Sequence, residues 1–248
     1  MSSQAGKYLL QALVLGFGFL WHENALATAE VTIKLGGGSG EIAPALQILL
    51  LLTALSLAPA LVLMLTSFTR IVVVLSLLRQ AIGTHQLPPG QILIGLALFL
   101  TVFVMTPVWT RVHQEAVEPY LANQISQKEA LAKAAVPIRE FMLKQTREKD
   151  LLLFVDLGRI EQPKEPSDIP MTVLIPAFMI SELKTAFQIG FVLHVPFIIL
   201  DLVVSSLLLS MGMLMLPPVM ISLPLKLMLF VLVDGWNLLV GSMVRSFA

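Results

Sequence analysis

Cysteine is absent from the 248 residues of this chain, and charged residues are scarce. Without cysteine there is no disulfide, no catalytic thiolate, no zinc site built on cysteine and no iron–sulfur cluster. Lys, Arg, Asp and Glu make up only 13% of the chain, about half their share in an average soluble domain. The 16 basic and 16 acidic side chains cancel, so no basic field favours nucleic acid as a partner.

Catalytic and metal-binding motifs are missing as well. The four histidines (His22, His85, His113, His194) are scattered without the spacing of metal ligands. The chain has no HExxH, GxSxG, P-loop or Rossmann fingerprint. We therefore expect no metal, no cofactor and no enzymatic activity.

Hydrophobic residues dominate instead. They make up 56% of the chain, and the mean hydropathy is +0.86, which is typical of a membrane protein. Of the 32 charged residues, 19 lie between Arg111 and Asp168, so one soluble insert separates two apolar halves. The predicted organisation is a signal peptide (1–27), a flexible tether (28–41), a first apolar helical region (42–109), a helical insert (110–168) and a second apolar helical region (169–248).

The N-terminal residues have the pattern of a secretory signal. Lys7 supplies the positive start, residues 8–20 form an apolar core, and Ala25-Leu26-Ala27 fits the small-x-small cleavage rule. The alternative is an uncleaved first membrane helix. The glycines at 36–40 lack the Lys-Ser/Thr of a phosphate loop, so we interpret them as part of the tether.

Several apolar stretches reach or approach the ~20 residues needed to cross a bilayer. They are residues 42–66, 91–109, 171–200 and 224–240. The run 71–78 is too short to cross. Arg70 and Arg79 flank it without a nearby acid, so the positive-inside rule predicts a cytoplasmic loop here.

Prolines and small residues mark the longest of these stretches. Pro176 and Pro196, like Pro59 in the first stretch, are predicted to bend or break a helix. Two small-xxx-small pairs predict close helix packing. They are Ala186 with Gly190, and Ser206 with Ser210.

Charged side chains inside apolar stretches need partners, because each costs about 2.5–3.5 kcal/mol to insert. Glu182 and Lys184 point about 200° apart on a helix, so they cannot satisfy each other. Lys226 is the natural candidate partner for Glu182, and we expect that contact between subunits more than within one chain. The alternative is that each snorkels to water separately.

Two carboxylates, Asp201 and Asp234, also lie in apolar surroundings. They could relay protons, as such groups do in transporters. The favoured interpretation is structural: they cap helices or pair with Arg70, Arg79 or Lys184.

Met211, Met213 and Met215 are spaced by two, beside Gly212 and Pro217-Pro218. A helix would scatter three such side chains, so the pattern predicts a turn or a broken helix. Flexible, polarisable methionines suit a surface that repacks around different partners. If copies of the chain surrounded a pore, this turn could seal it. The alternative is ordinary packing against lipid or core.

The insert is predicted to form two or three short amphipathic helices. Phe141 and Phe154 are among its main apolar groups. They either form a small private core or contact neighbouring subunits during assembly, and a core of fewer than about sixty residues would be marginal.

Six stretches resemble one family. They are SFTRIVVVLSLLR at 67–79, PP at 88–89, GLALFLT at 95–101, PAFMISELK at 176–184, ISLPLK at 221–226 and DGW at 234–236. In these, the chain is similar to the P-subunit family of the bacterial flagellar type III export gate, the FliP family. The match covers both apolar halves, whereas the insert agrees only in position and character.

The resemblance implies an all-α fold of bent helical hairpins with a small periplasmic insert. It implies that about five copies assemble into a helical, conical gate in the inner membrane, within the flagellar basal body. The implied partners are the smaller Q- and R-type subunits, the B-type switch subunit, membrane lipid and the exported unfolded proteins. It also implies a methionine gasket at Met211, Met213 and Met215, and a charge pair between Glu182 and Lys226 of adjacent subunits.

The predicted function is therefore a pore-forming subunit that conducts unfolded flagellar proteins and seals the resting pore. Two alternatives remain. One is a proton-coupled transporter using Asp201 and Asp234, although the two halves show no convincing internal repeat. The other is a structural anchor that never touches cargo.

Overall fold

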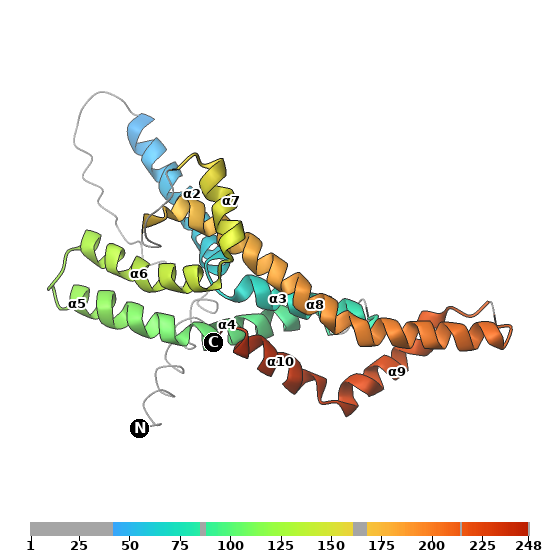
Figure 1. Cartoon of the computed structure of the whole chain (residues 1–248). Coiled ribbons are helices and arrows are strands. Elements are labelled where there is room, and N and C mark those ends of the chain that lie inside the picture. The colour runs from blue at the N-terminus through green and yellow to red at the C-terminus, as the bar shows by residue number, and fades with distance from the viewer. Residues whose placement is uncertain (1–41, 85–87, 161–167, 214, 248) are drawn as a thin grey trace, which may run out of the picture. The chain divides into compact units, whose positions relative to one another are not determined.

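The computed structural model describes residues 42–84, 88–160, 168–213 and 215–247, and the elements within these ranges are helices. The all-α prediction is confirmed. The predicted signal peptide and tether lie outside the described residues. The helices are α2 (Ile42–Met64), α3 (Phe68–Ile82), α4 (Gly90–Val112), the π-helical segment η2 (His113–Val117), α5 (Glu118–Leu121), α6 (Gln127–Gln145), α7 (Glu148–Leu157), α8 (Met171–Ser210), α9 (Pro218–Leu232) and α10 (Gly235–Arg245) (Figure 1).

Contacts divide the chain into two units, Met1–Leu52 and Thr53–Ala248. The described part of the first unit is the beginning of α2. All packing considered below lies within the second unit.

Two helical stretches among the described residues are long and apolar enough to cross a membrane, Gly90–Leu121 and Met171–Ser210. Two bent pairs also reach the required length if each pair counts as one span. They are Ile48–Met64 with Phe68–Ile82, and Pro218–Leu232 with Gly235–Arg245. These four correspond to the four apolar stretches of the sequence.

The run 71–78 is not a loop, and that prediction is wrong. It forms the middle of α3, where Ile71, Val74, Leu75 and Leu78 are almost completely buried. This helix packs against α8 and α4 and supplies the centre of the main core. At its end, Gly83 takes the left-handed conformation (φ 89°), which a residue without Cβ adopts readily. A stretch too short to span a membrane can thus still be a buried helix.

Helix α8 runs unbroken for 40 residues through both Pro176 and Pro196. Of the two predicted outcomes, a break is wrong at both prolines, and a bend stays a prediction. In apolar surroundings the helix is the conformation that satisfies the most backbone groups internally, so a chain tolerates the hydrogen bond that each proline removes.

Helices α3 and α8 approach each other closely at Gly190, as the Ala186/Gly190 pair predicts. Both small residues are buried, and a Cβ on Gly190 would lie 2.2 Å from Cδ1 of Leu77. Ser206 and Ser210 do not form a second such surface within the chain. Both are exposed, and their hydroxyls donate to carbonyls of their own helix.

The charged insert folds into η2, α5, α6 and α7. Helix α6 begins at Ser126, whose hydroxyl accepts a hydrogen bond from the Glu129 N–H and caps the helix. It packs against η2, α4 and α8, and α7 packs against α8. Met142 and Val155 of the insert join Leu174 and Phe178 of α8 in a second core cluster. The insert is therefore attached to α8 by apolar packing.

Helices α8 and α9 form a hairpin, and α9 meets α10 at 64° (Figure 1). Between α9 and α10, Asp234 has left-handed backbone angles (φ 50°, ψ 52°). Asp tolerates this conformation better than most residues do. The turn of this hairpin contains Met211, Met213 and Met215, so these methionines lie at one end of the second apolar region.

Candidate functional site

The three methionines lie in the turn of the α8–α9 hairpin. Helix α8 stops where Gly212 takes positive φ (74°) and its N–H donates to the Leu209 carbonyl at 3.0 Å. The Met213 N–H donates to the Leu208 carbonyl at 3.0 Å, which completes a Schellman motif. Pro217 and Pro218 then begin α9. The predicted turn is confirmed.

The methionine side chains of this turn point away from the chain's own core. Met211 is 71% exposed, Met213 38% and Met215 98%. Three thioethers on one fixed turn offer a soft apolar surface, which can contact many different side chains without one required geometry.

A second feature is a fully buried ion pair. Glu182 in α8 has no exposed surface, and its partner is Arg70 in the first turn of α3. The Arg70 Nε donates to one carboxylate oxygen at 2.9 Å, and Nη2 donates to the other. The guanidinium and the carboxylate thus meet in the two-pronged geometry that strengthens such pairs.

The remaining donors of Arg70 are also used. Nη1 donates to the backbone carbonyl and the hydroxyl of Ser246, at 3.1 and 3.0 Å, and Nη2 donates to the Gln145 side chain at 3.0 Å. Its guanidinium carbon lies 3.9 Å from the ring centroid of Phe247. All five N–H donors of the guanidinium therefore have acceptors. We call Arg70, Glu182, Gln145, Ser246 and Phe247 the Arg70 node.

Lys226 in α9 forms another polar group with Asp201 of α8. Its Nζ lies 2.6 Å from the Asp201 carboxylate and donates to the Ala81 carbonyl at 3.3 Å. The Ser222 hydroxyl donates to the other Asp201 oxygen at 2.6 Å. Because Ala81 lies in the last turn of α3, the ammonium also complements the carbonyl end of that helix. We call Lys226, Asp201, Ser222 and Ala81 the Lys226 node.

The expected contact between Glu182 and Lys226 is not made within the chain. Each has a different partner on another helix of the same chain, Glu182 with Arg70 and Lys226 with Asp201. The need for partners was correctly inferred, and within the chain other residues meet it; a contact between subunits stays a prediction. Spacing along one helix says which residues cannot meet, and it does not say which residues of other helices are near.

Other predicted buried charges lie in different surroundings. Arg79 is half-buried, and Lys184 is exposed, with its Nζ 4.0 Å from the Asp150 carboxylate. Asp234 is exposed at the start of α10, so the prediction that it is buried is wrong. Asp201 pairs with Lys226, which favours the structural interpretation over proton relay, but none of its predicted partners was right.

Phe141 and Phe154 pack inside the chain. The Phe141 ring lies 6.1 Å from that of Phe178, edge to face, and 6.3 Å from that of Phe247, stacked. Phe154 packs against the second core cluster. The core that these rings join is therefore shared with α8 and is not private to the insert. Contact of either ring with a neighbouring subunit stays a prediction.

Reasoning from the sequence missed Gln145, Ser222, Ser246 and Phe247. The first three are ordinary polar residues, and no spacing marks them. Arg70 itself carried the same signal as Glu182, a lone charge beside an apolar run. Among the residues that the structure describes, no group of three His, Asp or Glu is placed to hold a metal ion.

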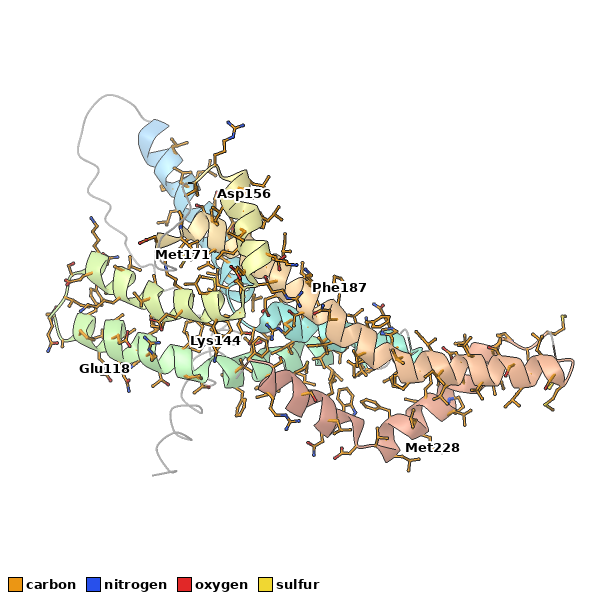
Figure 2. The ribbon with its side chains drawn as sticks, viewed as in Figure 1. Glu118, Lys144, Asp156, Met171, Phe187 and Met228 are labelled. Atoms are coloured by element: carbon orange, nitrogen blue, oxygen red, sulfur yellow. The ribbon has the colours of Figure 1, made fainter. Side chains whose placement is uncertain are left out.

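The outer faces of the long helices carry large apolar side chains. Figure 2 shows Phe187 on α8 and Met228 on α9 projecting outward, and both are more than half exposed. Further exposed apolar residues of this kind are Phe191, Val192, Ile199 and Leu202 on α8, and Val219, Met220, Val231 and Leu232 on α9. Lipid or neighbouring protein must cover such faces, because water does so only at a large cost in free energy.

Comparison with known proteins identifies the family of the chain. Residues 51–243 match the model of the FliP family. A flagellar biosynthetic protein FliP from Pectobacterium carotovorum subsp. carotovorum is 57% identical over 217 residues, 88% of this chain and 84% of that protein. The protein of the same name from Bacillus subtilis is 55% identical over 83% of this chain and 93% of its own length. One from Aquifex aeolicus is 49% identical over 96% of this chain and 98% of its own. The chain therefore belongs to the FliP family.

Proposed function

We propose that this chain is a pore-forming subunit of the flagellar type III export gate, through which unfolded flagellar proteins cross the inner membrane. Its family membership and the printed name of its relatives, flagellar biosynthetic protein, support a role in flagellar biosynthesis. The membrane-length helices support a location in the membrane. The observation that carries the proposal is the exposed turn with Met211, Met213 and Met215.

The turn suits a seal for three physical reasons. Its backbone is fixed on both sides, by the Schellman motif at Gly212 and by the prolines that begin α9. Its side chains are unbranched and adaptable, so they can close on one another or around a passing polypeptide. They are apolar, so a ring of them from several copies would also exclude water and ions from a narrow passage.

Assembly, in this proposal, depends on the apolar outer faces of α8 and α9. The Arg70 and Lys226 nodes hold their charges inside the chain, so they do not by themselves require a neighbour. A contact between Glu182 and Lys226 of adjacent subunits remains a prediction from the resemblance alone.

The partners follow from the proposed place in the gate. We expect several copies of this chain, the smaller Q- and R-type subunits, the B-type switch subunit, lipid, and the exported proteins. The charged insert, 110–168, is expected on the periplasmic side, as the resemblance to the FliP family implies.

Contact with cargo tests the proposal. A photo-crosslinking amino acid replaces Met213 in cells that export a flagellar protein, and the matched control carries it at Leu131, an exposed position of α6. The proposal predicts adducts with the exported protein from position 213 and none from position 131. If active export gives no adduct from position 213, the chain does not line the passage, and the anchor alternative is favoured.

A further inference from the structure

The end of the α8–α9 hairpin is tied together internally. We call residues 197–232 the tip hairpin, which comprises the last part of α8, the methionine turn and all of α9. Within it, Asp201 accepts hydrogen bonds from Lys226 at 2.6 Å and from Ser222 at 2.6 Å. These bonds join the two helices of the tip hairpin side to side, so they resist separate movement of its two arms.

The backbone connects the tip hairpin to the rest of the chain at two points. At each of them the helical hydrogen bonding is interrupted, and we call them the weak points. On α8 the connection is Pro196, which has no N–H, so the Val192 carbonyl receives no bond from it and the helix is easier to bend there. Two residues earlier, the His194 ring lies with Nδ1 2.8 Å from the Gly190 carbonyl. Since a carbonyl only accepts, Nδ1 is the donor.

On the other arm the connection is the bend between α9 and α10. Asp234 has positive φ, and the two helices meet at 64°. A Cβ on Gly235 would lie 2.3 Å from ring carbons of Phe230, so only glycine lets α10 begin this close to α9. The helical hydrogen-bond ladder is interrupted at this point.

On the far side of both weak points, one side chain joins the two segments of the chain. Arg70 binds Glu182, which precedes Pro196 in α8, and Ser246, which follows α10. The same guanidinium thus fixes the base of α8 and the end of α10, and both weak points lie between these anchors and the methionine turn.

An apolar crevice of about 690 Å³ lies at the level of the two weak points. Pro196 lines it from α8, and Val233 and Gly235 line it from the bend. Phe197 and Phe230, at the base of the tip hairpin, form part of the same wall. Most of its walls are apolar side chains, and such contacts impose no hydrogen-bond geometry on the position of the hairpin.

We propose that the tip hairpin is a lever that turns about Pro196 and the Val233–Gly235 bend and so moves the methionine turn relative to the fixed base. The bond from Lys226 to the Ala81 carbonyl, at 3.3 Å, links the lever to α3 and favours one position of it. This inference rests on the proposed function, because the lever has a purpose only if the methionine turn is a seal. A seal carried on a moving hairpin opens without unfolding of the chain.

Distance measurements between spin labels test the lever without any cargo. The chain has no native cysteine, so labels attach only where cysteine is introduced. The tip pair places one label at position 209, near the methionine turn, and the other at position 131 on α6. A reference pair joins Leu131 to Ile180, which precedes Pro196; all three side chains are exposed. Labelled chains are diluted with unlabelled ones in the membrane-extracted assembly, so that only distances within one chain are recorded.

The lever predicts a broader distance distribution for the tip pair than for the reference pair. Pro196→Ala restores a backbone donor and narrows the tip distribution, whereas Pro176→Ala, in the same helix but outside the crevice, leaves it unchanged. A tip distribution as narrow as the reference, or one that responds equally to both substitutions or to neither, overturns the lever. Since cargo plays no part, this result is independent of cross-linking from position 213, which tests the proposed function.

Discussion

Arg70 is the side chain on which most of the packing near the start of α3 depends. Its donors reach α8, the end of α6 and the segment after α10, and its flat face lies against Phe247. A buried ion pair is weak support for stability by itself, because removing two charges from water is costly. Once formed, however, it is costly to break, because the remaining charge is then buried without a partner.

Arg70→Ala should therefore destabilise the chain by about 3–5 kcal/mol, the usual range for removing one member of a buried pair. The measurement is thermal unfolding of the detergent-extracted protein. Arg111→Ala is the matched control, because its pairs with Glu115 and Glu140 are exposed, and it should leave the unfolding temperature nearly unchanged. Equal decreases in unfolding temperature in the two variants would mean that the Arg70 node stabilises the chain no more than an exposed ion pair does.

Lys226→Met should destabilise the chain by about 1.5–3 kcal/mol, the usual contribution of a hydrogen bond to a charged group. The substitution keeps the length of the side chain but leaves Asp201 and the Ala81 carbonyl without the ammonium. Lys184→Met serves as the control, since this lysine is exposed and only 4.0 Å from its acid. If unfolding in denaturant gives the two variants the same free energy of unfolding, the Lys226 node does not stabilise the chain.

Isolated charges in the sequence predicted that partners exist, but not their identity. Glu182 and Arg70 are 112 positions apart, and their contact depends on how α3 crosses α8. Nothing in the spacing of either helix specifies that crossing. For the same reason the sequence could not show that Ser246 and Gln145 complete the node.

At the scale of elements, the contact between α3 and α8 organises the main core. Gly190 is where these two helices come closest, and Leu77 of α3 occupies the space that a side chain would need. The small-xxx-small pattern predicted this close approach. The helix that makes it, α3, was predicted as a loop, because a length criterion for membrane spans does not detect a buried helix of 15 residues.

Gly190→Ala should destabilise the chain by about 1–3 kcal/mol, because the new methyl group meets Leu77 in a packed core. Leu77→Ala in the same chain should recover part of that loss. Gly95→Ala in α4 is the control, since no atom lies within 4 Å of the new Cβ there, and it should be neutral or stabilising. Unfolding measurements that show Gly190→Ala and Gly95→Ala to be alike would contradict the close packing.

The prolines of α8 show another limit of prediction at this scale. Proline rules derived from water-exposed helices predicted a bend or a break at Pro176 and Pro196, and α8 continues without a break through both. In apolar surroundings any other backbone conformation leaves more groups without hydrogen bonds. The turn at Met211 was predictable because Gly212 adopts the positive φ that ends a helix and Pro218 fits the first position of the next helix.

At the scale of the whole molecule, apolar side chains lie on the outside of long helices as well as in the core. The Arg70 node and the Lys226 node are satisfied inside the chain, while large apolar side chains cover the outside of α8 and α9. The charges of the two nodes therefore do not require a neighbour, whereas the apolar faces need a cover of lipid or protein. The sequence indicated a membrane protein with buried charges, but the partners of those charges are visible only once helices are packed.

The seal is the central claim, and ion permeability of resting cells tests it most directly. Replacing Met211, Met213 and Met215 with Ala shortens the apolar side chains of the turn and leaves its Gly and Pro residues in place. Replacing Met220 and Met228, two exposed methionines of α9, is the matched control. We predict that the turn variant assembles normally but leaks ions at rest, and that the control does not. Resting permeability that is unchanged in the turn variant would contradict the account.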